Sequence, residues 1–196
     1  MNDRPNPIVD IVKFLSSSGW PTPVFWVLLL ASCAIAALVW SRDPAQRSAR
    51  SVSLWLLRLF TGCMWWQQSL WKIPPNYGGL IYWMKQQVAH AAIVLQGELV
   101  DTIILPHIGL FGPLVYVIEV AIGISLMVGL LSRWGALLGL LMAINLWLGL
   151  YSAPGEWPWT YFFLIIIQAL FVIEPPGQTL GADSLISRAR PARLTG

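Results

Sequence analysis

The sequence predicts an all-α integral membrane protein, and three observations support this fold class. Of the 196 residues, 57% are hydrophobic and 11% are charged, whereas soluble domains average about 25% charged residues. The apolar residues fall in long blocks, each about long enough to cross a bilayer of roughly 30 Å. Spans of this length use about half of the chain, so we expect no second, soluble domain.

Five apolar blocks are predicted to cross the membrane. The first could be read as a signal peptide, but Asp3 and Asp10 precede it and deprive it of a clearly basic n-region. Tryptophans near both of its ends favour a span anchored at the two interfaces. Proline pairs, Pro74-Pro75 and Pro175-Pro176, end the second and fifth blocks. The predicted spans are Val24–Trp40, Val52–Trp71, Phe111–Leu131, Trp134–Tyr151 and Trp159–Ile173.

The distribution of arginines predicts the orientation. With five spans, the loop 41–50, the turn after the third span and the C-terminal tail lie on one side, whereas the opposite loop 152–158 holds Glu156 and no cation. By the positive-inside rule we expect the N-terminus outside and the C-terminus in the cytoplasm. Four spans, with the first block cleaved or lying on the surface, would leave the other spans in the same orientation. The arginines concerned are Arg42, Arg47, Arg50, Arg133, Arg188, Arg190 and Arg193.

The outer segment from Ile73 to Leu110 is long enough to need structure of its own. Apolar residues recur in it at helical spacing, with Lys85 and three glutamines off this stripe. We expect an amphipathic helix in the outer interface, folded as a cap over the mouth of the helices. The stripe consists of Leu80, Met84, Val88, Ala91, Ala92, Leu95 and Leu99.

Two ionisable side chains, Arg58 and Glu119, lie inside predicted spans, where a charge is costly and faces a partner or a cavity. Counted from the cytoplasmic ends of their spans, Arg58 lies at a depth of roughly 10 Å, Glu119 at roughly 18 Å and Asn145 at about 16 Å. These three residues are expected to converge in a polar centre that receives a quinone head group or relays protons. The structural alternative is an ion pair that fixes helix register, with Arg58 extending toward the cytoplasmic surface.

Gln67, Gln68 and Lys72 form a second candidate zone near the outer mouth. Lys72 is most simply an interfacial anchor at the end of its span. Its functional alternative is to meet Glu98 or Asp101, or an anionic ligand, beneath the cap.

The cysteines and histidines support neither a redox dithiol nor a metal site. Cys33 and Cys63 lie far apart in apolar blocks, and the sequence contains no C-x-x-C motif or Cys/His cluster. His90 and His107 lie outside the bundle at no haem or metal spacing. We find no haem, flavin, Fe–S or metal motif. The net charge of +3 arises in short loops, where topology explains it, so no nucleic-acid partner is expected.

Two stretches of the sequence resemble the DoxX family. Residues 58–72, R-L-F-T-G-C-M-W-W-Q-Q-S-L-W-K, are similar to its R-x-x-x-G…G-x-x-K opening helix. Residues 119–136, E-V-A-I-G-I-S-L-M-V-G-L-L-S-R-W-G-A, resemble its E-x-x-x-G-x-x-L-x-x-G-L-x-T-R-x-x-A segment, and G-A-D-S-L-I resembles its closing pattern. Ser69 stands where a glycine is usual, and Ser132 replaces the threonine. The matching residues are Arg58, Gly62, Lys72, Glu119, Gly123, Gly129, Leu130 and Arg133.

The resemblance covers about residues 52–187 and implies a four-helix membrane bundle in a bacterial or archaeal cytoplasmic (inner) membrane. An additional N-terminal transmembrane helix and the outer amphipathic helix complete the expected fold. We expect residues 1–50 to form a tail, the extra helix and a basic cytoplasmic loop. Residues 51–187 would form the DoxX-like bundle, and residues 188–196 a basic cytoplasmic tail.

For function, the resemblance implies quinone-linked redox chemistry, because one branch of the family is the small membrane subunit of a thiosulfate:quinone oxidoreductase. The first hypothesis is therefore a polytopic membrane subunit of a quinone-linked redox complex, with quinone as its cofactor. The alternative is a non-catalytic accessory or scaffolding subunit that stabilises a larger membrane complex. A transporter is less favoured, since no inverted repeat is evident. Under the first two hypotheses the partners are the lipid bilayer and other membrane protein subunits, one of which supplies electrons.

Overall fold

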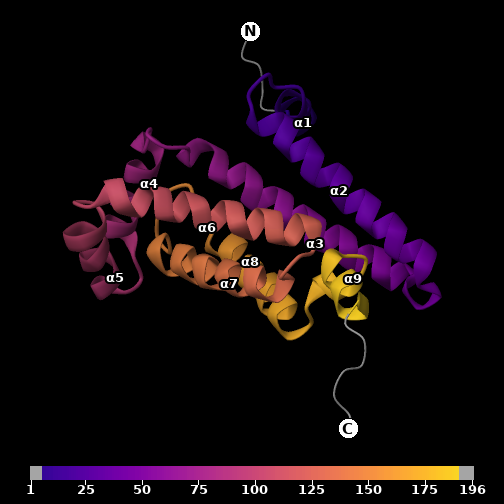
Figure 1. Ribbon diagram of the computed structural model, residues 1–196. Helices are drawn as coiled ribbons and strands as arrows, with labels where there is room; N and C mark the ends of the chain where they lie inside the picture. The colour runs from indigo at the N-terminus through magenta and orange to yellow at the C-terminus, as the bar shows by residue number, and fades with distance from the viewer. Residues whose placement is uncertain (1–5, 190–196) are drawn as a thin grey trace.

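A computed structural model describes residues 6–189 of the chain (Figure 1). Within this range the chain is almost entirely helical and contains no strand, which confirms the all-α fold class. Each predicted span is largely covered by one long helix. Arg190 and Arg193, which contribute to the predicted orientation, lie outside the described residues, as does the side chain of Arg188. The long helices are α2 (Pro21–Arg42), α3 (Ala49–Ser69), α6 (Ile108–Val128), α7 (Ser132–Gly149) and α8 (Pro158–Ile173).

Two of these helices, α2 and α6, are long and apolar enough to cross a bilayer by length and composition. The apolar helix α8 is shorter, at 16 residues. Polar residues lower the mean hydropathy of α3, which contains Arg58, Gln67 and Gln68, and of α7, which contains Arg133 and Asn145. An arginine buried within a helix pair, or placed at a helix end, does not prevent a span, but it removes the compositional signal.

The long helices pack in the order α3, α6, α7, α8, with α2 against α6 and α3 (Figure 1). Glycines allow the backbones of α3 and α6 to approach closely. A Cβ atom added to Gly62 would lie 2.7 Å from the backbone nitrogen of Met127, and one added to Gly123 would lie 3.0 Å from that of Trp66. Small residues serve this purpose in membrane helix pairs, where lipid removes the hydrophobic drive for association.

The segment between α3 and α6 folds over one end of these helices, where Figure 1 shows α4 and α5. It contains η2 (Leu70–Lys72), α4 (Gly78–His90), α5 (Val94–Leu99) and one π-helical turn, η3 (Val100–Ile104). In the expected helical stripe Leu80 and Met84 are buried, whereas Leu95 and Leu99 are exposed. The helix breaks after His90 because the N–H of Ala92 donates to the carbonyl of Leu148 on α7, at 2.7 Å.

Two short helices near the chain ends go beyond the prediction. At the first, α1 (Pro7–Leu15), the side chain of Asn6 accepts a hydrogen bond from the N–H of Ile8 at 3.0 Å, and Phe14 packs near Phe25 of α2. The second, α9 (Ala182–Ala189), follows the short turn η4 (Pro176–Gln178) and lies at the end opposite to α4 and α5 (Figure 1). On the same side, η1 (Pro44–Gln46) joins α2 to α3.

Candidate functional site

Arg58, on α3, is fully buried. Its guanidinium donates hydrogen bonds to the carbonyls of Leu126 and, at 3.0 Å, Met127, both in the last turn of α6. It also donates to the carbonyl of Leu180 at 3.3 Å. The last carbonyls of a helix have no partner within the helix and carry the negative end of its dipole. Arg58 therefore binds the C-terminal end of α6 and ties it to the segment that precedes α9.

The expected contact between Arg58 and Glu119 is wrong. Leu126 lies about two turns, or ~10 Å, along α6 from Glu119, so a guanidinium held there does not reach the carboxylate. The structural alternative is correct in part: Arg58 does join helices and reaches toward the end of the molecule that carries the exposed arginines, but its guanidinium is buried among carbonyls and Glu119 pairs with Lys72 instead. The absence of a side chain at Gly129 leaves space for the guanidinium, because a Cβ atom there would lie 2.6 Å from Nη1 of Arg58.

Asp183, on α9, caps the next helix at the same end of the molecule. Its carboxylate accepts hydrogen bonds from the N–H of Leu131 at 2.7 Å and from the N–H and hydroxyl of Ser132 at 3.0 and 2.7 Å. These groups begin α7, where a helix leaves its first N–H donors unpaired. We call Arg58, Gly129, Ser132 and Asp183 the latch, because together they join α3, the α6–α7 turn and α9.

Glu119, on α6, forms a buried ion pair with Lys72, which lies at the end of η2. The ammonium group contacts both carboxylate oxygens. The side chain of Glu119 is 1% exposed and that of Lys72 is 7% exposed. Lys72 Nζ also lies 4.3 Å from the centre of the Trp71 ring, an arrangement that favours a cation. The expectation that Lys72 is an interfacial anchor is therefore wrong. Its partner is Glu119 rather than Glu98 or Asp101, because η2 turns the lysine inward toward α6.

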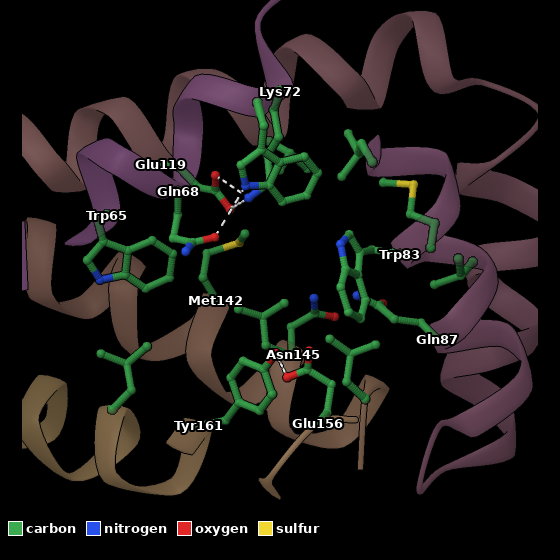
Figure 2. A pocket seen from close by; sticks show the side chains of 18 of the residues that line it. Trp65, Gln68, Lys72, Trp83, Gln87, Glu119, Met142, Asn145, Glu156 and Tyr161 are labelled. Carbon is green, nitrogen blue, oxygen red and sulfur yellow. Dashed lines mark hydrogen bonds and ion pairs between the residues drawn. The ribbon is translucent and has the colours of Figure 1, made fainter. Parts of the chain in front are cut away.

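This ion pair borders a cavity of about 510 Å³ between the helices and the covering segment (Figure 2). Three indole rings contribute to its lining, those of Trp65 on α3, Trp71 on η2 and Trp83 on α4. Most of the remaining lining is apolar and comes from the covering segment (α4 and η3) as well as from α6, α7 and α8. Figure 2 shows Lys72 and Glu119 on one side of the cavity and Tyr161 with Glu156 on another. The Tyr161 hydroxyl donates to Glu156 at 2.7 Å.

The predicted site residues separate into two groups. Glu119, Asn145, Gln68 and Lys72 line the cavity, whereas Arg58 belongs to the latch. Asn145 does not contact Arg58; its side-chain oxygen accepts a hydrogen bond from Gln96 of α5 at 3.0 Å. Gln68 accepts one from the Trp71 indole at 3.3 Å. The two candidate zones of the sequence thus merge into one site, without Arg58 and Gln67.

Gln67 lies one position from Gln68 on α3, and it is exposed and outside the cavity lining. A helix turns by about 100° per residue, so two neighbouring residues do not face the same side.

Several cavity residues were not expected from the sequence. Gln87 was assigned to the polar face of the cap, yet it is buried against Gly149 and lines the cavity. Trp83 lies one turn before Gln87 on the same face of α4, and this spacing was the available signal. Tyr161 near the start of α8 also lines the cavity, where its hydroxyl donates to Glu156.

Among the described residues, no group of three or more His, Cys, Asp or Glu side chains is placed to hold a metal ion. Cys33 is exposed, Cys63 is half-buried, and both are free thiols. The polar side chains that line the cavity offer an ammonium, carboxylates, amides, a phenol and the hydroxyl of Thr160.

Comparison with known proteins identifies the family. The DoxX family model matches residues 53–152, just over half of the chain. The chain belongs to the DoxX family. Neither the curated proteins nor the solved structures yielded a match. The matched DoxX region runs from α3 to just beyond α7, and it therefore includes Arg58, Lys72, Glu119 and Asn145.

DoxX membership and the apolar helices together make this a membrane protein in contact with the lipid bilayer. The structure also gives a physical reason for several residues of the DoxX-like patterns. Gly62 and Gly123 permit the contact between α3 and α6, and Gly129 leaves space for Arg58. Lys72 and Glu119 form the ion pair beside the cavity. The pattern therefore combines residues that hold the helices together with two that border a cavity.

Proposed function

We propose that this DoxX-family chain is a membrane subunit of a quinone-linked redox complex and that the cavity holds a quinone head group. The observation that carries this proposal is a cavity that combines flat indole walls with a buried ammonium–carboxylate pair at its border. A small-molecule site typically has a volume of 300–1,000 Å³ and a mostly apolar lining with a few placed polar groups. The cavity, at about 510 Å³, lies within that range.

The residues present fit a quinone ring in shape and in chemistry. Trp65, Trp71 and Trp83 offer flat surfaces against which an aromatic ring can stack. The Lys72 ammonium and the Gln68 amide offer hydrogen-bond donors for quinone carbonyl oxygens. A group that is apolar apart from two carbonyls suits this combination better than a compact ion does, since an ion would need more polar partners.

Lys72 and Glu119 would act on the ligand through charge and protons. A quinone accepts two electrons and two protons on reduction, so a site for it benefits from donors close to its oxygens. The ammonium would orient a carbonyl oxygen and stabilise negative charge on it, while Glu119 holds the ammonium in place. Electrons would be supplied by a partner subunit of the complex.

We further propose that α2, α3, α6, α7 and α8 cross the cytoplasmic membrane of a bacterium or archaeon, with the N-terminus outside. Support comes from the exposed arginines Arg47, Arg50 and Arg133, which lie at the helix ends near η1 and α7's first turn. The positive-inside rule assigns that end to the cytoplasm. The cavity and its cover of α4 and α5 then lie on the outer side.

A binding measurement tests the quinone proposal. The protein in lipid nanodiscs is titrated with a short-chain benzoquinone while tryptophan fluorescence is recorded. We expect saturable quenching, weakened about tenfold or more in Lys72→Gln, since an ionic hydrogen bond is worth about 1.5–3 kcal/mol. The control Lys85→Gln changes an exposed lysine of α4 and is expected to bind as the wild type does. Equal quenching by the two variants would contradict a quinone site in the cavity.

The second candidate function is an accessory or scaffolding subunit. It is favoured by an apolar patch beside the cavity cover, where Val94 and Leu95 of α5 are 76% and 70% exposed. Exposed apolar patches mark interaction surfaces. Under this alternative, the chain co-purifies in stoichiometric amount with a larger membrane protein in mild detergent, and Lys72→Gln leaves the activity of the assembled complex unchanged.

A further inference from the structure

A gap between α3 and α8 opens one side of the cavity. Helix α3 packs extensively against α6, and α8 packs extensively against α7, while α3 and α8 scarcely approach each other along their backbones. The first close contact of α3 with this part of the chain is with η4, beyond the end of α8. A bundle of four helices in the order α3, α6, α7, α8 is therefore closed by backbone packing on three of its four sides.

Side chains fill the part of this gap that lies toward the latch. Trp65 of α3 and Phe171 of α8 belong to one buried hydrophobic cluster, and they are 1% and 2% exposed. Gln168, one turn before Phe171, is fully buried as well. The cavity occupies the other part, toward α4. There its lining includes Gln68, Trp71 and Thr160, and all three are exposed. We call these three residues the rim.

The rim lies beside the apolar surface of α8. Thr160 lies one turn before Phe163 and about 60° from it around the helix, at the edge of the outward side that Phe163 shares with Leu170 two turns further on. Phe163 and Leu170 are both 54% exposed. Large exposed apolar side chains in line along a membrane helix contact lipid. The opening at Thr160 therefore borders a lipid-facing stripe of α8.

We infer that the cavity is loaded sideways from the bilayer, between α3 and α8, past the rim of Gln68, Trp71 and Thr160. This inference rests on the proposed quinone function and names the class of ligand more closely. The ligand has a flat polar head and a long apolar tail, and it is dissolved in the membrane. The head lies beside Lys72 and Glu119, while the tail leaves through the gap and remains among the lipids. Small water-soluble substrates do not use this path.

Cysteine labelling tests the opening without any ligand. In a Cys33→Ser/Cys63→Ser background, Thr160→Cys is treated with an apolar maleimide dissolved in the bilayer and, separately, with a sulfonated, water-soluble thiol reagent. Phe163→Cys is the matched control for a lipid-facing position on the same helix, and Asn76→Cys, in the exposed turn before α4, is the control for a position in water. We expect Thr160→Cys to be labelled as Phe163→Cys is, readily by the apolar maleimide and slowly by the sulfonated reagent. Labelling by the sulfonated reagent at the rate of Asn76→Cys would overturn the sideways opening.

Loading kinetics then test the path itself. Thr160→Trp narrows the rim, whereas Phe163→Trp adds similar bulk one turn away on the lipid-facing surface. In nanodiscs we expect Thr160→Trp to slow the quenching of tryptophan fluorescence by a long-tailed benzoquinone about tenfold, with Phe163→Trp unchanged, because access limits the rate of association and not only the affinity. An unchanged rate in Thr160→Trp would overturn the path. Thr160→Cys could be labelled by the apolar maleimide alone while the protein binds no quinone. That result would support the sideways opening and reject the quinone function, so failure of the opening and failure of the proposed function can be told apart.

Discussion

Lys72 and Glu119 each carry a charge at a place where either charge alone would be costly. Both side chains are nearly excluded from solvent and contact each other directly. The pair is therefore a structural unit as well as a feature of the cavity, and any functional test must separate these two contributions. Stability measurements on single and double variants do so.

Glu119→Gln is expected to destabilise the protein more than Lys72→Gln/Glu119→Gln does. The single change leaves the Lys72 ammonium buried without its carboxylate, which typically costs about 3–5 kcal/mol, whereas removing both charges leaves two neutral amides. Thermal denaturation in detergent, followed by far-UV circular dichroism, measures the difference. Lys85→Gln serves as the control for losing one exposed lysine charge. A double variant less stable than either single variant would show that the pair is not the unit described here.

At this scale the sequence identified the important charges but mispaired them. Arg58, Lys72 and Glu119 stand out because ionisable residues are rare in predicted spans. Counting depth from helix ends brought Arg58 and Glu119 together, because that count cannot show that main-chain carbonyls would occupy the guanidinium. The same depth count also places Lys72 at the end of a straight helix, whereas the 3₁₀ turn of η2 directs the lysine side chain inward.

The pairing of α3 with α6 depends on glycines that allow the two backbones to meet. Gly62→Ala is expected to destabilise the protein by about 1–3 kcal/mol, because the new methyl group would lie 2.7 Å from a backbone nitrogen of α6. Gly109→Ala, on α6 with nothing within 4 Å of the added carbon, is the matched control and is expected to be neutral or slightly stabilising. The measurement is the apparent Tm of Gly62→Ala and of Gly109→Ala in detergent. Equal Tm values for the two variants would contradict a close contact at Gly62.

The start of α7 depends on a residue far away in the sequence. Asp183→Asn is expected to lower stability by about 1 kcal/mol, since the neutral amide is a weaker partner for the N–H groups of Leu131 and Ser132. The exposed Asp101→Asn changes charge equally and provides the control. Hydrogen exchange of the first turn of α7 is the more specific measurement. Unchanged protection there in Asp183→Asn would contradict its role as a cap.

Helix positions along the chain follow from local sequence, while their ends depend on tertiary contacts. Apolar length and the prolines place the long helices to within a few residues. The break between α4 and α5 has no such signal, since the hydrogen bond from Ala92 to Leu148 joins segments that are distant in sequence. The local sequence does contain a signal for the start of α1, because Asn6 followed by Pro7 is a typical pair at a helix N-terminus. A nine-residue helix is nevertheless easily taken for an irregular tail.

At the scale of the whole molecule, the two ends differ in chemistry. The latch end uses Arg58 and Asp183 to join helices through main-chain groups. The other end contains the cavity, its indole walls and a cover of short helices. If the chain crosses a membrane as proposed, the latch end lies at the cytoplasm and the cavity end lies outside.

The orientation gives the last prediction. In a Cys33→Ser/Cys63→Ser background, Asn76→Cys lies in the turn before α4 and Ala45→Cys lies in η1, and both positions are exposed. A membrane-impermeant maleimide added to intact cells or right-side-out vesicles is expected to label Asn76→Cys and to spare Ala45→Cys, because arginine-rich loops are retained in the cytoplasm. Inverted vesicles are expected to give the opposite pattern. The reverse result would place the cavity end in the cytoplasm, and a quinone site there would exchange with the inner leaflet and receive electrons from a partner on that side.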